Sequence, residues 1–174
     1  ARHGYERRRP AYIRFDRSGI PNIYEGFNAM SESEAEFEPG YWVRDEGKIA
    51  SPATIIATGV MTHQALKVQA LLNQTTNFNW RAVDVYRIKP FPWEDLRQWI
   101  ANGPVVTIEE HFLAGGLGSM VAEYLLDSGM INRLLRLGRT EKSGFCFQYG
   151  GREAIWRDMG LNIEAIVERI KTWL

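Results

Sequence analysis

Hydrophobic and polar positions follow two alternating periods along residues 53–174. Short runs of consecutive apolar and β-branched residues are typical of strands buried on both faces, and apolar residues recurring every three or four positions are typical of amphipathic helices. The runs predict strands over 54–59, 82–86, 104–108 and 132–137. The helical pattern predicts helices over 61–72, 93–100, 117–125, 151–159 and 162–173, the last with Asn162 as its cap.

A chain that alternates strands and helices in this way builds parallel strands, because each helix carries the chain back to the starting edge of the sheet. Such helices bury the sheet on both sides. We therefore predict an α/β fold in three layers: an open, twisted, mostly parallel sheet of about five strands with helices on both faces. The pattern does not determine the strand order or whether one strand runs antiparallel.

The first 47 residues lack this repeat. Residues 11–15, Ala-Tyr-Ile-Arg-Phe, are rich in strand-forming types and precede turn residues, which predicts a strand. From 23 to 47, glycine, proline, serine and acidic residues recur without a sustained period, which indicates a connection between domains. The predicted organisation is a remnant of a preceding domain over 1–22, a linker over 23–47 and the main domain over 48–174.

The amino-acid composition limits the classes of function that we expect for this chain. Hydrophobic residues make up 45% and charged residues 24% of 174, and 21 basic residues balance 21 acidic ones. A zero net charge gives no overall attraction to nucleic acid or to an anionic membrane. No apolar stretch approaches the roughly 20 residues that span a bilayer, and the arginine-rich start is not a secretory signal. We expect a cytoplasmic protein whose single cysteine, Cys146, is a packed core thiol rather than a nucleophile.

One glycine-rich turn joins the third predicted strand of the main domain to its helix. It has the sequence Glu-Glu-His-Phe-Leu-Ala-Gly-Gly-Leu-Gly-Ser over 109–119. Such a turn directs backbone N–H groups and the positive end of a helix dipole toward the same point, so an anion is a candidate ligand. The spacing is neither that of the dinucleotide fingerprint nor that of a nucleotide P-loop. The candidate anion-facing residues are Gly115, Gly116, Gly118 and Ser119.

The acidic and histidine residues before this turn are the other candidates for chemistry. Glu109 and Glu110 are adjacent, so they point to opposite faces of a strand and do not form a carboxylate pair across one substrate. His111 is a candidate general base, or a histidine that bonds the linker or a neighbouring subunit. The remaining histidines, His3 and His63, are scattered, which gives little support for a metal site.

Several stretches, in the same order and spacing, resemble the C-terminal part of the transketolase family. They are Tyr12–Phe15, Ile55–Gly59, Ile88–Phe91, Thr107–His111, Gly115–Ser119, Val121–Glu123 and Gly160–Asn162. Within this resemblance, Tyr12–Phe15 is similar to the last strand of the family's pyrimidine-binding domain. The remaining stretches are similar to the C-terminal domain that follows it.

The resemblance implies a non-catalytic role. In the family, thiamine diphosphate and Mg²⁺ sit between two other domains, and the C-terminal domain supplies neither the diphosphate-binding motif nor the activating glutamate. This chain has no Gly-Asp-Gly motif, so no catalytic, cofactor-binding or metal-binding residue is assigned to it. We expect the chain alone to be inactive, and the complete enzyme to be a transferase of carbohydrate metabolism that moves two-carbon ketol units between sugar phosphates.

The implied partners are the thiamine-diphosphate-binding domains or subunit of the same enzyme, within a homodimer that this domain helps to hold together. The Glu109–His111 segment and the glycine turn would then line an interface. Two alternatives share versions of the same domain: 1-deoxyxylulose-5-phosphate synthases and the partner-docking domain of 2-oxoacid dehydrogenase beta subunits. A third alternative is a free-standing domain that binds a small molecule at the glycine turn.

Overall fold

A computed structural model describes residues 10–17, 19–21, 23, 39–45, 52–101, 103–144 and 149–174. The chain divides into two compact units, Ala1–Pro39 and Gly40–Leu174. Cys146 and most of the predicted linker lie outside the described residues, so the expectations for them stay predictions.

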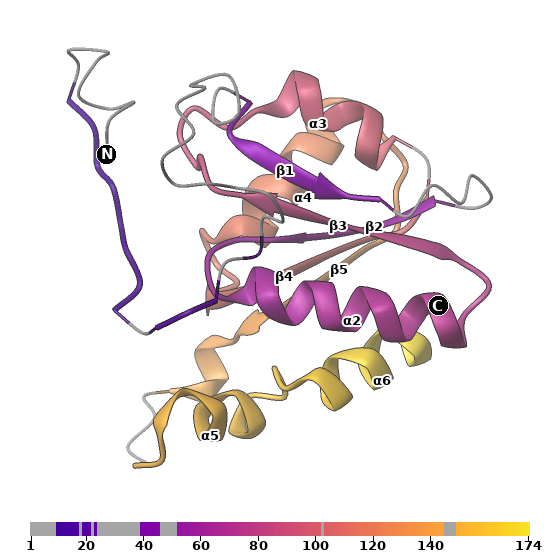
Figure 1. The fold of residues 1–174 in the computed structure, drawn as a ribbon. Coiled ribbons are helices and arrows are strands. Elements are labelled where there is room, and N and C mark those ends of the chain that lie inside the picture. Colours follow the sequence, from indigo (N-terminus) through magenta and orange to yellow (C-terminus); the bar gives the residue numbers. More distant parts are fainter. Residues whose placement is uncertain are drawn as a thin grey trace. The chain divides into compact units, whose positions relative to one another are not determined.

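The second unit is built on a five-stranded sheet (Figure 1). Its strands are β1 (Tyr41–Arg44), β2 (Pro52–Ala57), β3 (Asn79–Val85), β4 (Val105–Phe112) and β5 (Leu134–Arg139). They lie in the order β1-β3-β2-β4-β5, with β1 antiparallel to β3 and all other pairs parallel. The predicted α/β class and the mostly parallel sheet are confirmed, and the one antiparallel strand is the edge strand β1.

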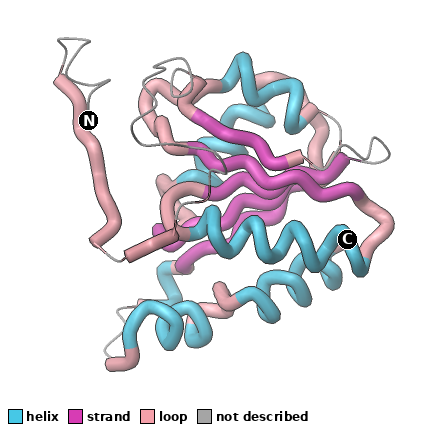
Figure 2. Tube along the Cα trace, viewed as in Figure 1, coloured by secondary structure: helices cyan, strands magenta, loops and turns pink. Residues whose placement is uncertain are grey.

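Helices cover both faces of the sheet. They are α2 (Met61–Thr75), α3 (Trp93–Ile100), α4 (Leu117–Asp127), α5 (Gly151–Asp158) and α6 (Ile163–Trp173), with a short 3₁₀ turn, η2, at Glu141–Ser143. Figures 1 and 2 show α2, α5 and α6 on one side of the sheet and α3 and α4 on the other. Among the helices that the structure describes, none is long and apolar enough to cross a membrane.

Each face of the sheet has its own apolar core, because successive side chains of a buried strand point to opposite sides. One core contains buried residues of β2, β3, β4, α2 and α6 and of the turn before α6: Ile55, Met61, Leu72, Trp80, Ile108, Leu161, Ile166 and Ile170 are among its members. The other lies under α3 and α4 and includes Ile56, Val83, Leu96, Ile100, Val105 and Val121. Burial of one large aliphatic side chain contributes about 1.5–3 kcal/mol, so these two cores hold the three layers together.

Strand β1 was not predicted from the sequence and lies inside the predicted linker. Tyr41 pairs with Val85 and Arg44 with Ala82, so the compact unit begins at Gly40 rather than at residue 48. Strand β1 has four residues, pairs with β3 at the edge of the sheet and is only half-buried. It therefore lacks the continuous apolar run by which a central strand is recognised in a sequence.

One local expectation was wrong, and the expected cap of α6 was confirmed. Residues 11–15 form no strand in the described structure, and the side chains of Tyr12 and Phe15 are 92% and 74% exposed; strand-forming residues become a strand only when a neighbouring strand takes their backbone hydrogen bonds. Asn162 does occupy the N-cap position of α6, but its side chain makes no capping bond. Its Nδ2 instead donates to Oε2 of Glu164 at 2.7 Å.

The core assignment predicts that two chemically identical substitutions in helices have different costs. Leu72 in α2 is fully buried, whereas Leu126 in α4 is 80% exposed. Leu72→Ala is expected to lower the free energy of unfolding by about 2–5 kcal/mol, and Leu126→Ala by no more than about 0.5 kcal/mol. Urea unfolding followed by circular dichroism measures both; equal losses would contradict the assignment of Leu72 to the core.

Candidate functional site

The glycine-rich turn follows the carboxyl end of β4, where an α/β sheet of this order most readily forms a ligand crevice. After β2 the chain adds β3 on one side of it and then β4 on the other. The crevice of such a sheet lies at the carboxyl ends of the strands where the order reverses. The sequence analysis thus placed its candidate residues at the edge where the topology favours a site.

Glu109 occupies the position that an anion would take at this turn. Its side chain is 1% exposed. The backbone N–H of Leu117 donates to Oε2 at 2.8 Å, and the N–H of Gly118 donates to Oε1 at 2.8 Å. The N-cap residue Gly116 offers no side-chain bond, so the carboxylate of Glu109 satisfies N–H groups that the first turn of a helix leaves without partners.

The glycines of the turn make room for this carboxylate. A Cβ atom on Gly116 would lie 2.0 Å from Oε2 of Glu109, and one on Gly138 in β5 would lie 2.9 Å from its Cγ. Gly116 has an ordinary φ of −87°, so its lack of a side chain serves close approach rather than backbone conformation. Gly115 differs: its φ is +72° and no heavy atom lies within 4 Å of its Cβ position.

A second set of bonds closes the turn behind the carboxylate. The hydroxyl of Ser119 donates to the carbonyl oxygen of Leu113 at 2.6 Å and accepts from the N–H of Gly115 at 3.1 Å. Arg136 Nη1 donates to the same hydroxyl at 3.2 Å. Each of the turn residues that the sequence analysis proposed as anion-facing is therefore part of one intrachain arrangement around Glu109.

Burial and hydrogen bonding act in opposite directions on Glu109. Burial raises its pKa, because removing a carboxylate from water disfavours the charged form. The N–H groups of Gly118 and Leu117, followed by the charges of His111 and Arg136, lower it in part. The net pKa is raised.

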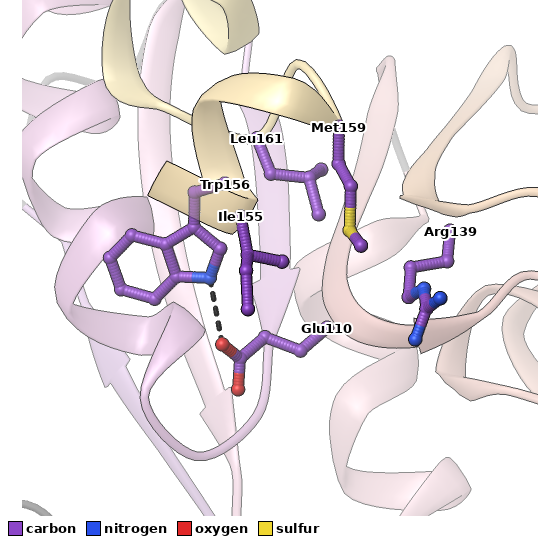
Figure 3. Close-up of a pocket in the computed structure, with 6 residues that line it drawn as sticks. All are labelled: Glu110, Arg139, Ile155, Trp156, Met159 and Leu161. Atoms are coloured by element: carbon purple, nitrogen blue, oxygen red, sulfur yellow. Dashed lines mark hydrogen bonds between the residues drawn. The ribbon is translucent and has the colours of Figure 1, made fainter. Parts of the chain in front are cut away.

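Glu110 points to the opposite face of β4 and anchors α5. The indole N–H of Trp156 donates to its Oε1 at 2.7 Å (Figure 3). Arg152 Nε lies 3.1 Å from the same oxygen. The prediction that the two adjacent glutamates do not act as one carboxylate pair is thereby supported: Glu109 holds α4 on one side of the sheet, and Glu110 holds α5 on the other.

A small pocket of about 180 Å³ lies beside Glu110. It is lined by Glu110, Arg139, Ile155, Trp156, Met159 and Leu161 (Figure 3). Pockets that enclose organic ligands usually measure about 300–1,000 Å³, so this hollow is too small for a sugar phosphate or a thiamine cofactor.

The structure describes two of the three histidines, His63 and His111. His111 is exposed, and its Nδ1 lies 3.1 Å from the carbonyl oxygen of Phe112; its expected contact with the linker or a neighbouring subunit stays a prediction. Burial lowers the pKa of His63, and the nearby charge of Asp84 offsets only part of this shift. Within the described residues, no group of three or more His, Cys, Asp or Glu side chains could hold a metal.

Sequence reasoning missed the residues around the glutamates that come from distant segments. They are Arg136 and Gly138 on the α4 side and Arg152 with Trp156 on the α5 side. One signal was available: Arg136 is a charged residue inside the otherwise apolar run 134–138, and charged residues in such runs usually have a buried partner.

Comparisons with known proteins identify the family. Residues 40–143 match the family model described as "Transketolase, C-terminal domain". The chain belongs to this family. The match starts at the same residue as the compact unit, immediately before β1.

The family resemblance extends to curated relatives and to a solved structure. A Methanocaldococcus jannaschii protein described as a transketolase C-terminal section is 34% identical over 92% of this chain and 47% of its own length. A 1-deoxy-D-xylulose-5-phosphate synthase of a Synechococcus strain is 31% identical over 93% of this chain and 24% of its own length. A structure titled split gene transketolase, inactive beta4 tetramer, matches with 32% identity and a TM-score of 0.71, covering 91% of this chain and 48% of that one. The chain thus spans about half or less of the relatives it matches.

The close approach of Gly116 to Glu109 predicts a coupled pair of substitutions. Gly116→Ala is expected to lower the free energy of unfolding by about 1–3 kcal/mol, because its methyl group collides with Oε2. In a Glu109→Ala background this loss should shrink, although a contact with the carbonyl oxygen of Phe112 at 2.5 Å remains in both. A double-mutant cycle by urea unfolding measures the difference. Gly115→Ala, which meets no atom, is the control and should cost the same in both backgrounds.

The raised pKa of Glu109 predicts a pH dependence with a definite sign. The folded state holds the proton more tightly than the unfolded chain, so this contribution to stability is complete below the ordinary glutamate pKa of 4.5 and declines as pH rises through the raised value. The difference in unfolding free energy between the wild type and Glu109→Ala should therefore be larger at the acidic end of that window than at pH 8. A difference that grows with pH would contradict the raised pKa.

Proposed function

We propose that this chain is the non-catalytic C-terminal domain of a transketolase-like, thiamine-diphosphate-dependent enzyme, and that it serves assembly and support of the cofactor-binding part. In the complete enzyme the reaction is the transfer of a two-carbon ketol unit between sugar phosphates. The cofactor and its Mg²⁺ bind to domains or a subunit other than this chain. The enzyme acts in the cytoplasm as a homodimer, or a larger assembly, of its complete units.

The observation that carries this proposal is the way in which Glu109 and Glu110 are used. Each has the residue type and the position of a catalytic acid, at the carboxyl end of a central strand. Each instead bonds a helix of its own chain: the N–H groups of Leu117 and Gly118 take one carboxylate, and Trp156 with Arg152 takes the other. Carboxylates bonded in this way stabilise the domain and are not directed at a substrate.

The greater length of the relatives supports the proposal that this chain works with a further domain or subunit. The chain covers 47% and 48% of two transketolase-related proteins and 24% of a synthase, so half or more of such an enzyme lies outside it. The proposal assigns the cofactor-binding residues to that remaining part. We propose that residues 1–22 continue that part and that 23–39 connect it to the compact unit that begins at Gly40. The exposed side chains of Tyr12 and Phe15 are then covered by that part.

A second candidate, 1-deoxy-D-xylulose-5-phosphate synthase, is favoured by the names of several relatives that are 30–31% identical. Transketolase is preferred because the matches that cover about half of a relative carry transketolase names. The two candidates are distinguished by analysing the product of a complete enzyme in which this domain is joined to its partner. A transketolase gives a ketol-transfer product, whereas the synthase gives 1-deoxy-D-xylulose 5-phosphate.

The proposal predicts that the 174-residue chain alone binds no thiamine diphosphate. Calorimetric titration with thiamine diphosphate and MgCl₂ should give only heat of dilution, whereas the same titration of the chain joined to the thiamine-binding part should saturate. Saturable binding to the chain alone would contradict the proposal, as would an unchanged activity of the joined enzyme after deletion of residues 40–174.

A further inference from the structure

The cradle around Glu109 has more hydrogen-bonding capacity than Glu109 uses. Two N–H groups of the α4 N-terminus bond its oxygens, and Arg136 adds a positive charge that favours the carboxylate. A further donor is free: the hydroxyl of Thr107 is fully buried and has no hydrogen-bond partner. It lies against the first turn of α4, 2.7 Å from the Cβ position of Gly118.

The strand pairing brings these groups to one place. Thr107 and Glu109 are two residues apart on β4, so their side chains lie on the same face of the sheet, and Arg136 stands opposite Thr107 on β5. A buried hydroxyl without a partner is unfavourable, because it has lost its hydrogen bonds to water. Its presence beside two N–H donors and a guanidinium is a property of an oxyanion-binding site rather than of a helix N-terminus alone.

We propose that the Gly115–Ser119 turn is a binding site for a small carboxylate, that its resident ligand is the side chain of Glu109, and that a free carboxylate of matching size binds there when that side chain is removed. The neighbouring glycines make room for this group. A Cβ atom on Gly116 would lie 2.0 Å from Oε2 and one on Gly138 would lie 2.9 Å from Cγ, so the carboxylate fits only because neither residue carries a side chain. The two N–H groups each bond one of its two oxygens, which is an arrangement that matches a planar carboxylate. The proposal is independent of the enzyme to which the domain belongs, because it concerns this chain alone.

Acetate is the appropriate probe. Glu109→Ala removes one methylene and the carboxylate, which together have the size and shape of acetate. An anion that binds only the folded state shifts the unfolding equilibrium by mass action; at about ten times its dissociation constant it raises the folded-to-unfolded ratio about tenfold, which corresponds to about 1.4 kcal/mol.

The experiment compares urea unfolding of the wild-type and Glu109→Ala chains in sodium acetate and in sodium chloride of equal ionic strength. Glu109→Ala should be destabilised in chloride and recover about tenfold in its folded-to-unfolded ratio as acetate saturates. The wild type should not respond, because its site is filled. Sulfate and the neutral isostere acetamide should have no such effect on either chain.

Two further variants separate binding from general stabilisation. Glu109→Gln keeps the volume and should not respond to acetate, since its amide group fills the site. Adding Thr107→Val to Glu109→Ala removes the free donor and should raise the half-saturating acetate concentration severalfold. In ¹H–¹⁵N spectra of Glu109→Ala, acetate should shift the amide signals of Leu117 and Gly118 toward their wild-type positions.

The following results would overturn the proposal. One is a Glu109→Ala chain that acetate stabilises no more than chloride, or that remains unfolded in both. Another is equal stabilisation of the wild type and of Glu109→Gln by acetate. A third is stabilisation of Glu109→Ala by sulfate as strong as that by acetate, which would mean that charge alone and not carboxylate geometry is recognised.

Discussion

The structure depends on one buried contact, the carboxylate of Glu109 against the N-terminus of α4. An ionised carboxylate inside a protein is costly unless it is hydrogen-bonded and compensated by charge. Two backbone N–H groups and the nearby Arg136 supply part of that compensation, and the pKa of Glu109 stays raised. Because the carboxylate must approach the turn closely, Gly116 and Gly138 can carry no side chain without displacing it. The carboxylate of Glu109 therefore explains why the turn has a glycine at position 116.

Strand β4 connects both layers of helices through neighbouring residues. The period of two along a strand sends Glu109 to the side of α4 and Glu110 to the side of α5. Trp156 and Arg152 extend the second contact, so that the C-terminal helices are held to the sheet by a charged bond as well as by the apolar core that contains Ile166 and Ile170. The same end of the strand, which carries chemistry in many α/β enzymes, is here used to hold the domain together.

This use gives the acidic residues of the stretch 107–119 a structural role in the domain. The stretch 107–119 contains two acidic residues, a histidine and a glycine-rich turn of a kind that can bind an anion. Its composition alone does not decide between a structural and a catalytic role for these residues. In the folded chain, the carboxylates bond helices, Ser119 bonds the turn, and His111 lies exposed beside Phe112.

The sequence by itself determined the α/β class, the succession of helices and central strands along the chain, and the position of the turn, because those features follow from continuous apolar runs, from the 3.6-residue period of helices and from glycine placement. It also placed Glu109 and Glu110 on opposite faces. Only the tertiary structure decided that β1 completes the sheet, that residues 11–15 form no strand, and that Glu109 is the ligand of its own turn. Those outcomes depend on which distant segments meet: an edge strand needs the free side of β3, and a buried carboxylate needs donors that Leu117, Gly118 and Arg136 supply only after β4, β5 and α4 have packed.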